Sequence, residues 1–294
     1  MPVDARVAGI WRYPVKSMLG EPMTECEVGA AGLVGDRAYA LIDAVDGKVA
    51  SAKNPRKWAA LLGCRAAFLD DSVVEISLPD GARVRTDEPD VDSVLSRAIG
   101  RQVRLASTAP DERAFEEVWP DIDGLAPVDV IAGTNIGTDE DGQMVSQFPL
   151  GSLAPAGTFF DLSVMHVLTT ATLARLQAIT PTATFDVRRY RPNLLVEVDG
   201  EPGFVENDWV GQTLRVGDEA RLSITLSTMR CVMTTLAQED LPRDRDTLRT
   251  IASHNRVDIT GFGTWACAGV YADVAASGTI RVGEAVSRAE EGPR

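Results

Sequence analysis

Short runs of alternating hydrophobic and polar residues dominate the first hundred positions of the chain. A period of two places one side of a strand against a core and the other side in solvent. The runs that follow this pattern are 6–13, 23–28, 38–42, 64–69, 73–78, 82–85 and 103–105. Because glycines separate many of them, we expect a small antiparallel or barrel-like β domain in this part of the chain.

Two helices are expected to interrupt these strands. One follows Pro55 and extends to Leu62. The other begins near Pro89, because proline is tolerated in the first turn of a helix, and ends at Gly100, a residue type that commonly terminates helices.

From about residue 108 to 158 the chain is rich in Pro, Gly, Asp and Ser and has little periodicity. Such a stretch is typical of a long connection or surface excursion, and we place a domain boundary within it.

Strand patterns resume in the second half of the chain. They cover 161–168, 194–198, 213–216, 221–226, 269–274 and 279–282. A helix is expected from Thr169 and Thr170, because apolar residues follow at helical spacing and threonine hydroxyls cap helix starts. A shorter helix is expected over 247–252. We therefore predict a mainly β fold with a few helices (α+β), divided into domains at 1–120 and 121–294.

The charge balance argues against several classes of partner. The chain has 43 acidic and 29 basic side chains and a net charge of −14, which disfavours binding to nucleic acid or to an anionic membrane. The first 25 positions lack the apolar stretch of a signal peptide, and no later segment predicts a membrane span. We expect a cytoplasmic protein in which any anionic ligand is held by a local basic cluster.

The cysteines limit the metal sites that the chain can form. They stand at 26, 64, 231 and 267, far apart and without a C-x-x-C pair, and the chain has two histidines. This spacing argues against a ribbon-type zinc site and against a ferredoxin-type iron–sulfur cluster. In a reducing compartment we expect free thiols.

Cys231 is the candidate reactive residue. It lies in the run Ser-Thr-Met-Arg-Cys-Val-Met-Thr-Thr, at the end of a strand pattern. A thiolate is a soft metal ligand and a nucleophile, and we expect Arg230 to lower the pKa of this thiol toward neutrality. Because most free cysteines are simple core residues, the other residues of the chain must decide between these roles.

Clustered basic residues form a candidate anion site. Arg188, Arg189 and Arg191 lie within four positions of one another, and an anion would remove their mutual repulsion. Lys16, with Ser17, and Arg37 supply further polar groups on turns that contain proline or glycine. The alternatives are a solvated basic edge paired with carboxylates, ordinary surface turns and, for Thr169 and Thr170, simple helix capping.

Six motifs occur together and in order along nearly the whole chain. They are Tyr-Pro-Val-Lys-Ser (13–17), Gly-Leu-Val-Gly-Asp-Arg (32–37), Arg-Tyr-Arg-Pro-Asn (189–193), Trp-Val-Gly-Gln-Thr-Leu-Arg-Val-Gly-Asp (209–218), Arg-Cys-Val-Met-Thr-Thr (230–235) and Gly-Thr-Ile-Arg-Val-Gly (278–283). In this combination the chain resembles the MOSC proteins that carry an N-terminal β-barrel domain. Among these it is similar to molybdenum enzymes of the amidoxime-reducing kind.

The resemblance implies an N-terminal β-barrel domain, a MOSC β-barrel domain and a molybdenum cofactor, Mo-molybdopterin, held between them. Cys231 matches the family's protein ligand to the metal. The positions that match or adjoin cofactor-binding positions are Lys16, Ser17, Arg37, Arg189, Arg191, Asn193 and Arg230, while Thr169 and Thr170 match a polar pair that approaches the cofactor.

The implied activity is the two-electron reduction of a small N-oxygenated (N-hydroxylated) compound, with loss of its oxygen as water. No cysteines for a ferredoxin-like domain follow residue 283, so a separate electron-transfer protein is expected, either cytochrome b5-like or a ferredoxin or flavin reductase. Two alternatives stay open: a sulfur carrier with a persulfide on Cys231, and a cofactor-binding protein without turnover.

Overall fold

The computed structural model describes residues 5–110, 114–139, 141–151 and 154–289. Strands predominate in these ranges, so the predicted mainly β fold with a few helices is confirmed. The described α-helices are α1 (Pro55–Trp58), α2 (Val91–Ile99), α3 (Val128–Thr134), α4 (Thr170–Ile179) and α5 (Asp246–His254). The described 3-10 helices are η1 (Ala59–Gly63), η2 (Val187–Arg189), η3 (Val205–Trp209) and η4 (Val232–Thr235).

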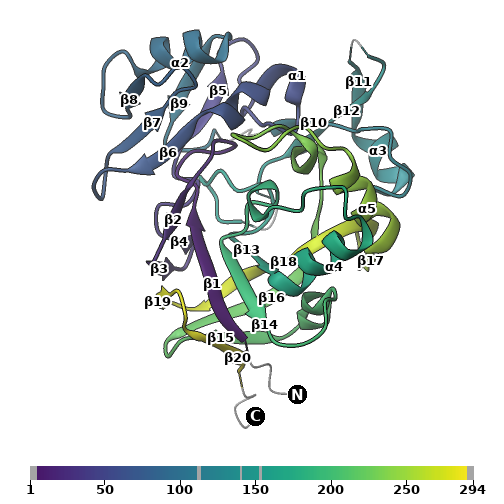
Figure 1. Cartoon of the computed structure of the whole chain (residues 1–294). Coiled ribbons are helices and arrows are strands. Elements are labelled where there is room, and N and C mark those ends of the chain that lie inside the picture. Colours follow the sequence, from purple (N-terminus) through teal and green to yellow (C-terminus); the bar gives the residue numbers. More distant parts are fainter. Residues whose placement is uncertain (1–4, 111–113, 140, 152–153, 290–294) are drawn as a thin grey trace.

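A closed barrel forms the larger part of the molecule (Figure 1). Its strands, in order around the described sheet, are β13 (Met165–Thr169), β14 (Leu194–Val198), β1 (Ala5–Arg12), β20 (Ala285–Arg288), β15 (Thr213–Val216), β16 (Ala220–Met229) and β18 (Gly263–Ala276). Pairing of β13 with β18 closes the ring. Strands β2 (Glu21–Met23) and β17 (Arg256–Ile259) extend it at β1 and β18.

The barrel interior is filled by alternating apolar residues. Ile10 on β1, Leu222 on β16 and Val270 on β18 are buried members of one cluster, as the period-two pattern of these strands requires. β1 pairs with β14 and β20, which lie near the other end of the sequence. The first strand of the chain is therefore a structural part of the C-terminal barrel.

A second group of small sheets, made by the N-terminal third of the chain, lies beside the barrel (Figure 1). The strands are β5 (Ala40–Asp43) with β9 (Val103–Ala106), and β6 (Arg65–Phe68) with β7 (Val74–Ser77) and β8 (Arg83–Arg85). Leu95 of α2 and Leu61 of η1 pack with these strands in a separate core. A third sheet joins β3 (Glu25–Gly29) and β4 (Gly32–Leu33) to β19 (Gly278–Arg281).

The expected helices are present at the expected places. α1 and η1 follow Asn54, α2 ends at Gly100 in the left-handed conformation, and α4 begins after Thr169, whose side chain accepts a hydrogen bond from Thr172 N. The short helix expected over 247–252 is part of α5.

The segment expected to be a connection contains regular structure. Within 108–158, of which residues 111–113, 140 and 152–153 lie outside the described residues, β10 (Ala114–Val118) pairs with β12 (Met144–Pro149), which pairs with β11 (Asn135–Thr138). β10 contains Glu116 and Glu117, and both side chains are buried beside lysines. Because two adjacent acidic residues interrupt the alternation of hydrophobic and polar positions, the sequence pattern did not predict this strand.

Candidate functional site

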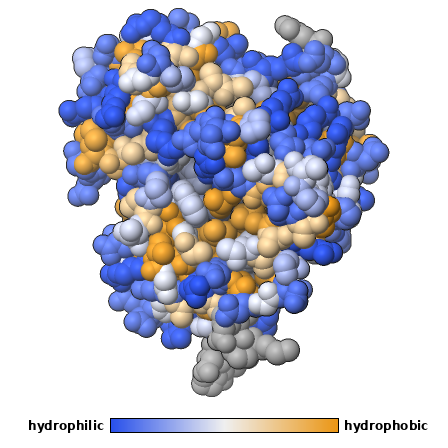
Figure 2. All heavy atoms as spheres, viewed as in Figure 1, coloured by the Kyte–Doolittle hydropathy of each residue, from blue (hydrophilic) through white to orange (hydrophobic). Residues whose placement is uncertain are grey.

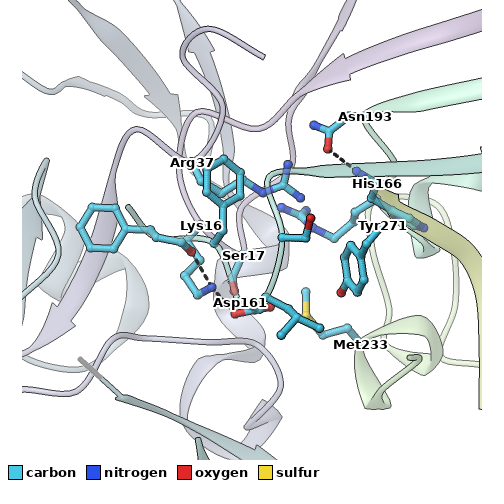
Figure 3. A pocket seen from close by; sticks show the side chains of 13 residues that line it. Lys16, Ser17, Arg37, Asp161, His166, Asn193, Met233 and Tyr271 are labelled. Carbon is cyan, nitrogen blue, oxygen red and sulfur yellow. Dashed lines mark hydrogen bonds and ion pairs between the residues drawn. The ribbon is translucent and has the colours of Figure 1, made fainter. Parts of the chain in front are cut away.

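Two adjoining cavities contain most of the residues singled out from the sequence. The first, here called the cationic pocket, is shown in Figure 3. The second, here called the aromatic chamber, contains Cys231 and Arg230 in its wall. Asp161, Leu162 and Tyr271 line both, so a ligand in one lies next to the other.

The cationic pocket is built from three loops that the sequence places far apart. Lys16 and Ser17 follow β1, Arg37 precedes β5, and Arg191 and Asn193 precede β14. The structure thus brings together five of the residues predicted to bind the cofactor.

Three of these residues have a left-handed backbone that non-glycine residues rarely adopt. The φ angles are 64° at Ser17, 49° at Arg37 and 53° at Arg191. Such conformations cost energy, and they cluster at sites where the surrounding structure holds a side chain in a required direction. Ser17 is held by the Ala52 amide, which donates to its Oγ at 3.1 Å.

Tyr13 lies between two of the pocket's guanidinium groups. The Arg191 guanidinium carbon lies 4.2 Å from the centre of the Tyr13 ring and that of Arg37 lies 4.6 Å from it. Arg37 also pairs with Asp36, whereas Arg191 donates to the Met18 carbonyl oxygen at 2.7 Å. In the described part of the chain no carboxylate forms an ion pair with Arg191, so its charge is available to an anion in the pocket.

Lys16 is buried at the floor of the pocket. Its Nζ donates to the Phe159 carbonyl oxygen at 2.8 Å and pairs with Asp161. Burial lowers the pKa of Lys16 to about 8, although Asp161 acts in the opposite direction. Burial alone would raise the pKa of Asp161, but Lys16 and Lys53 outweigh it and hold that pKa well below its usual range.

One buried amide connects the barrel to this pocket. Asn193 Nδ2 donates to Asp36 Oδ2 at 2.9 Å, and Asn193 Oδ1 accepts from the His166 amide at 3.0 Å. The ring of His166 lines the pocket, and its Nε2 has no hydrogen-bond partner among the described residues. Burial and then the nearby Arg230 charge lower the pKa of His166 well below its usual value, so the ring is neutral.

Cys231 lies at the end of β16, where the chain leaves the barrel and enters η4. It is 8% exposed and faces the aromatic chamber. Arg230 donates to the Tyr190 carbonyl oxygen at 3.0 Å, and its Nε has no partner among the described residues.

The prediction that Arg230 lowers the thiol pKa toward neutrality is wrong for the chain by itself. Burial raises the pKa of Cys231, and the lowering effects of Lys53 and Arg230 do not compensate for it. A buried thiol of this kind loses its proton when it coordinates a metal cation.

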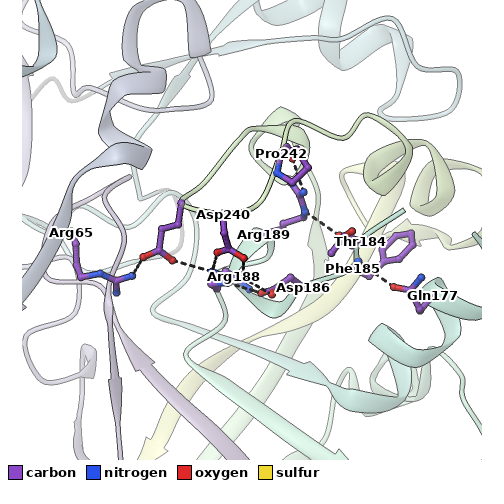
Figure 4. A network of polar contacts seen from close by, with 10 residues as sticks. Arg65, Gln177, Thr184, Phe185, Asp186, Arg188, Arg189, Asp240 and Pro242 are labelled. Atoms are coloured by element: carbon purple, nitrogen blue, oxygen red, sulfur yellow. Dashed lines mark hydrogen bonds and ion pairs between the residues drawn. The ribbon is translucent and has the colours of Figure 1, made fainter. Parts of the chain in front are cut away.

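Two of the predicted cofactor-binding positions have structural contacts instead of cavity contacts. Arg189 is fully buried (0% exposed) and donates to the carbonyl oxygens of Thr184, Leu236 and Pro242 at 2.7–3.0 Å. Figure 4 shows its contacts with Thr184 and Pro242. Thr169 caps α4 and donates to Glu206 Oε2 at 2.7 Å.

Arg189, Thr169 and Thr170, the last being the first residue of α4, are absent from the described residues that line the two cavities. The third basic residue of the cluster, Arg188, pairs with Asp186, Glu239 and Asp240, also shown in Figure 4.

The structure adds residues that the sequence alone did not single out. Lys53 Nζ lies 3.4 Å from a carboxylate oxygen of Glu117 and 3.4 Å from one of Asp161. Lys53 lines the aromatic chamber, and Asp161 lines both cavities. His166 and Tyr271 face each other across neighbouring strands, in register as a β13–β18 pair. A lysine in a turn and single residues in strands carry no sequence signal, since only strand pairing brings them to the site.

Comparison with known proteins identifies the class. The model of the MOSC domain matches residues 157–287, and that of the MOSC N-terminal beta barrel domain matches residues 4–114. The chain is a MOSC domain protein with an N-terminal MOSC β-barrel domain.

Among curated proteins, the chain is similar to the human protein named mitochondrial amidoxime-reducing component 1. The two are 25% identical over 308 residues, which cover 95% of this chain and 82% of the human protein. Among solved structures, the YUAD protein from Bacillus subtilis aligns with 99% of both chains, with a TM-score of 0.46 and 9% identity.

Two further findings concern metals and membranes. Within the described ranges, His, Cys, Asp and Glu side chains form no group of three that could hold a metal ion. Nor does any described helix have the length and apolar character needed to cross a membrane.

Proposed function

We propose that the protein is a molybdenum-cofactor oxidoreductase that reduces small N-oxygenated compounds. Cys231 is the proposed protein ligand to the metal. The cationic pocket would hold the phosphate of the pterin, and a separate electron-transfer protein would supply the electrons. The adjacency of a cavity thiol to a cationic pocket is the observation that carries this proposal.

The donors present fit such a group. Arg191 and Lys16 present a guanidinium and an ammonium group to a pocket in which Ser17 and Asn193 add polar atoms. His166 lines the pocket and Arg230 lines the chamber, and each has a buried nitrogen without a partner among the described residues, His166 Nε2 and Arg230 Nε, with which pterin heteroatoms would form hydrogen bonds. Thiolate is the soft ligand type that suits molybdenum–sulfur chemistry.

In this proposal the bound cofactor supplies the two-electron chemistry, and the protein supplies binding and orientation. Arg37 and Arg191, fixed against Tyr13, would neutralise the phosphate. Asp161 holds Lys16 and Lys53 in place at the junction of the two cavities. The chamber wall, largely apolar, would limit the water around the reacting group.

The proposal is tested by producing the protein under molybdenum-replete conditions and assaying benzamidoxime with a chemical reductant. We expect formation of benzamidine in proportion to molybdenum content. Absence of reduction in fully loaded protein would overturn the assignment.

A sulfur carrier is the alternative function, because Cys231 lies in a cavity beside Lys53, whose charge favours a thiolate or persulfide anion. A carrier does not need stoichiometric pterin, whereas the reductase does. A third alternative, a cofactor-binding protein without turnover, would contain pterin and fail the reduction assay. A cytoplasmic location belongs to the same proposal, in agreement with four free thiols.

A further inference from the structure

The aromatic chamber has a wall composition that suits a particular kind of small molecule. Phe115, Trp119, Phe148, Phe262 and Trp265 line it, and the rings of Trp119 and Trp265 lie 6.0 Å apart between centroids. Flat apolar bodies bind well against a wall of such rings, because aromatic contacts add to the burial of apolar surface.

One buried carboxylate projects into this apolar wall. Phe115, Glu117 and Trp119 follow one another at every second position from β10 onward, so all three side chains lie on the chamber side. Glu117 is 6% exposed, and its carboxylate forms an ion pair with Lys53 Nζ at 3.4 Å. A carboxylate has room for several donors, so Glu117 retains acceptor sites for a ligand N–H group.

Opposite charge lies within the same chamber. Lys53 and Arg230 both line it, and Cys231 lies next to Arg230. The chamber therefore offers an acceptor for N–H groups and cations for a negatively polarised oxygen. An amidoxime head, which is uncharged but dipolar, carries an amino group and an oxime oxygen at the two ends of one N–C=N–O unit.

We propose that this chamber holds the flat apolar body of the substrate, and that Glu117 is a specificity-determining residue that accepts a hydrogen bond from an N–H group beside the reacting nitrogen. This inference rests on the proposed function for the choice of head group. The geometry of β10 supports it independently, because the neighbouring Glu116 lies on the opposite side of the strand and pairs with Lys48 and Lys57.

The test measures binding without turnover. Trp119 and Trp265 line the chamber, so bound benzamidoxime should change the tryptophan fluorescence of the purified protein. Glu117→Gln should weaken benzamidoxime binding several-fold, because the neutral amide oxygen can still accept the hydrogen bond but without the strengthening that a negative charge gives. The matched control Glu116→Gln should leave the affinity unchanged, with calorimetry as a second measure of binding for all variants.

A second pair of variants distinguishes recognition of the ligand's polar head group from recognition of its aromatic ring. Phe262, 39% exposed at the chamber wall, can be shortened with little effect on the core. Phe262→Ala should weaken benzamidoxime several-fold while leaving acetamidoxime, which has the same head and no ring, unaffected. Glu117→Gln should weaken both compounds.

Equal benzamidoxime affinity in wild type and in a folded Glu117→Gln variant would overturn the role of Glu117. Circular dichroism establishes folding, and Glu117→Asp, which keeps the carboxylate, provides a second variant that should retain part of the affinity. Benzamidoxime reduction that is insensitive to both chamber variants would overturn the inference and leave the reductase proposal intact. Binding in the chamber without reduction by loaded protein would do the reverse.

Discussion

At the scale of single residues, the arginine cluster shows why sequence proximity is a poor guide to role. Arg189 and Arg191 are two positions apart, yet Arg189 bonds to backbone carbonyls in the interior and Arg191 faces the cationic pocket. The difference arises at Arg191, where a left-handed backbone reverses the direction of the side chain. Periodicity and motif spacing do not reveal such a turn.

Substitution of the two arginines should therefore separate binding from stability. We expect Arg191→Ala to weaken sulfate binding roughly tenfold with a small change in melting temperature, because a charged donor is lost from a cavity. Arg189→Ala should lower the free energy of unfolding by about 3 kcal/mol, since it leaves several buried carbonyl groups unpaired. Calorimetric titration and thermal unfolding measure the two effects. The opposite assignment of effects would contradict the pocket described here.

Lys16 predicts a pH dependence. Its pKa is lowered to about 8 by burial, so the positive charge is lost as the pH rises through that value. Sulfate, whose own charge is constant in this range, should bind progressively more weakly above a pH of about 8. Because the folded pKa lies below that of an unfolded lysine, the same titration contributes stability that increases as the pH rises. Lys16→Arg should remove the decline in sulfate binding, and a decline that persists in that variant would show that Lys16 does not cause it.

At the scale of elements, the polar residues at the β13–α4 junction hold neighbouring elements together and do not line a cavity. Thr169 and Thr172 both donate to Glu206 Oε2 at 2.7 Å, while the Gly269 amide donates to Glu206 Oε1 at 3.1 Å. Burial raises the pKa of Glu206, and these hydrogen bonds oppose that effect. The junction thereby fastens α4 to η3 and β18.

Thr169→Val removes the helix cap and one bond to Glu206 without changing the size of the side chain. The expected cost is roughly 1–2 kcal/mol of unfolding free energy, typical of a lost cap. Sulfate affinity should be unchanged, because the described cavities do not include Thr169. Denaturant titration and sulfate titration of the same sample check both expectations, and a large loss of affinity at normal stability would argue for a ligand-binding role.

The elements that the sequence predicted well are those with a local cause. Gly100 ends α2 and Thr169 starts α4 because each residue acts on its own neighbours. β10 was not predicted, since Glu116 and Glu117 are buried by pairing with Lys48 and Lys53, residues more than sixty positions away. The same long-range pairing brings Lys53 to Cys231, which explains why that lysine was also missed.

At the scale of the whole molecule, a net charge of −14 coexists with an internal concentration of positive groups. In the view of Figure 2 hydrophilic residues cover most of the surface, with apolar patches across the middle of the face. The basic side chains that matter to the proposed function line two adjoining cavities. A positive site within a negative protein favours a specific anion over nucleic acid or membrane surfaces.

The division into residues 1–120 and 121–294 stays a prediction, and β1 makes it testable. This strand pairs with β14 and β20 and so completes the C-terminal barrel. A fragment of residues 121–294 should fail to give a cooperative thermal transition, because the barrel would lack strand β1 and the edges of β14 and β20 would be left unpaired. Extension of that fragment with a β1 peptide should restore the transition, whereas cooperative unfolding of the fragment alone would show that the barrel does not need β1.

The most direct test of the account is the molybdenum and pterin content of the wild type beside Cys231→Ser, with Cys26→Ser, on β3, as the matched control. All three proteins should be produced under molybdenum-replete conditions and compared after confirmation of folding. We predict stoichiometric molybdenum and pterin in the wild type and in Cys26→Ser, and a marked loss of molybdenum in Cys231→Ser. Full molybdenum in Cys231→Ser, or none in the wild type, would contradict the assignment of Cys231 as the metal ligand beside a phosphate-binding pocket.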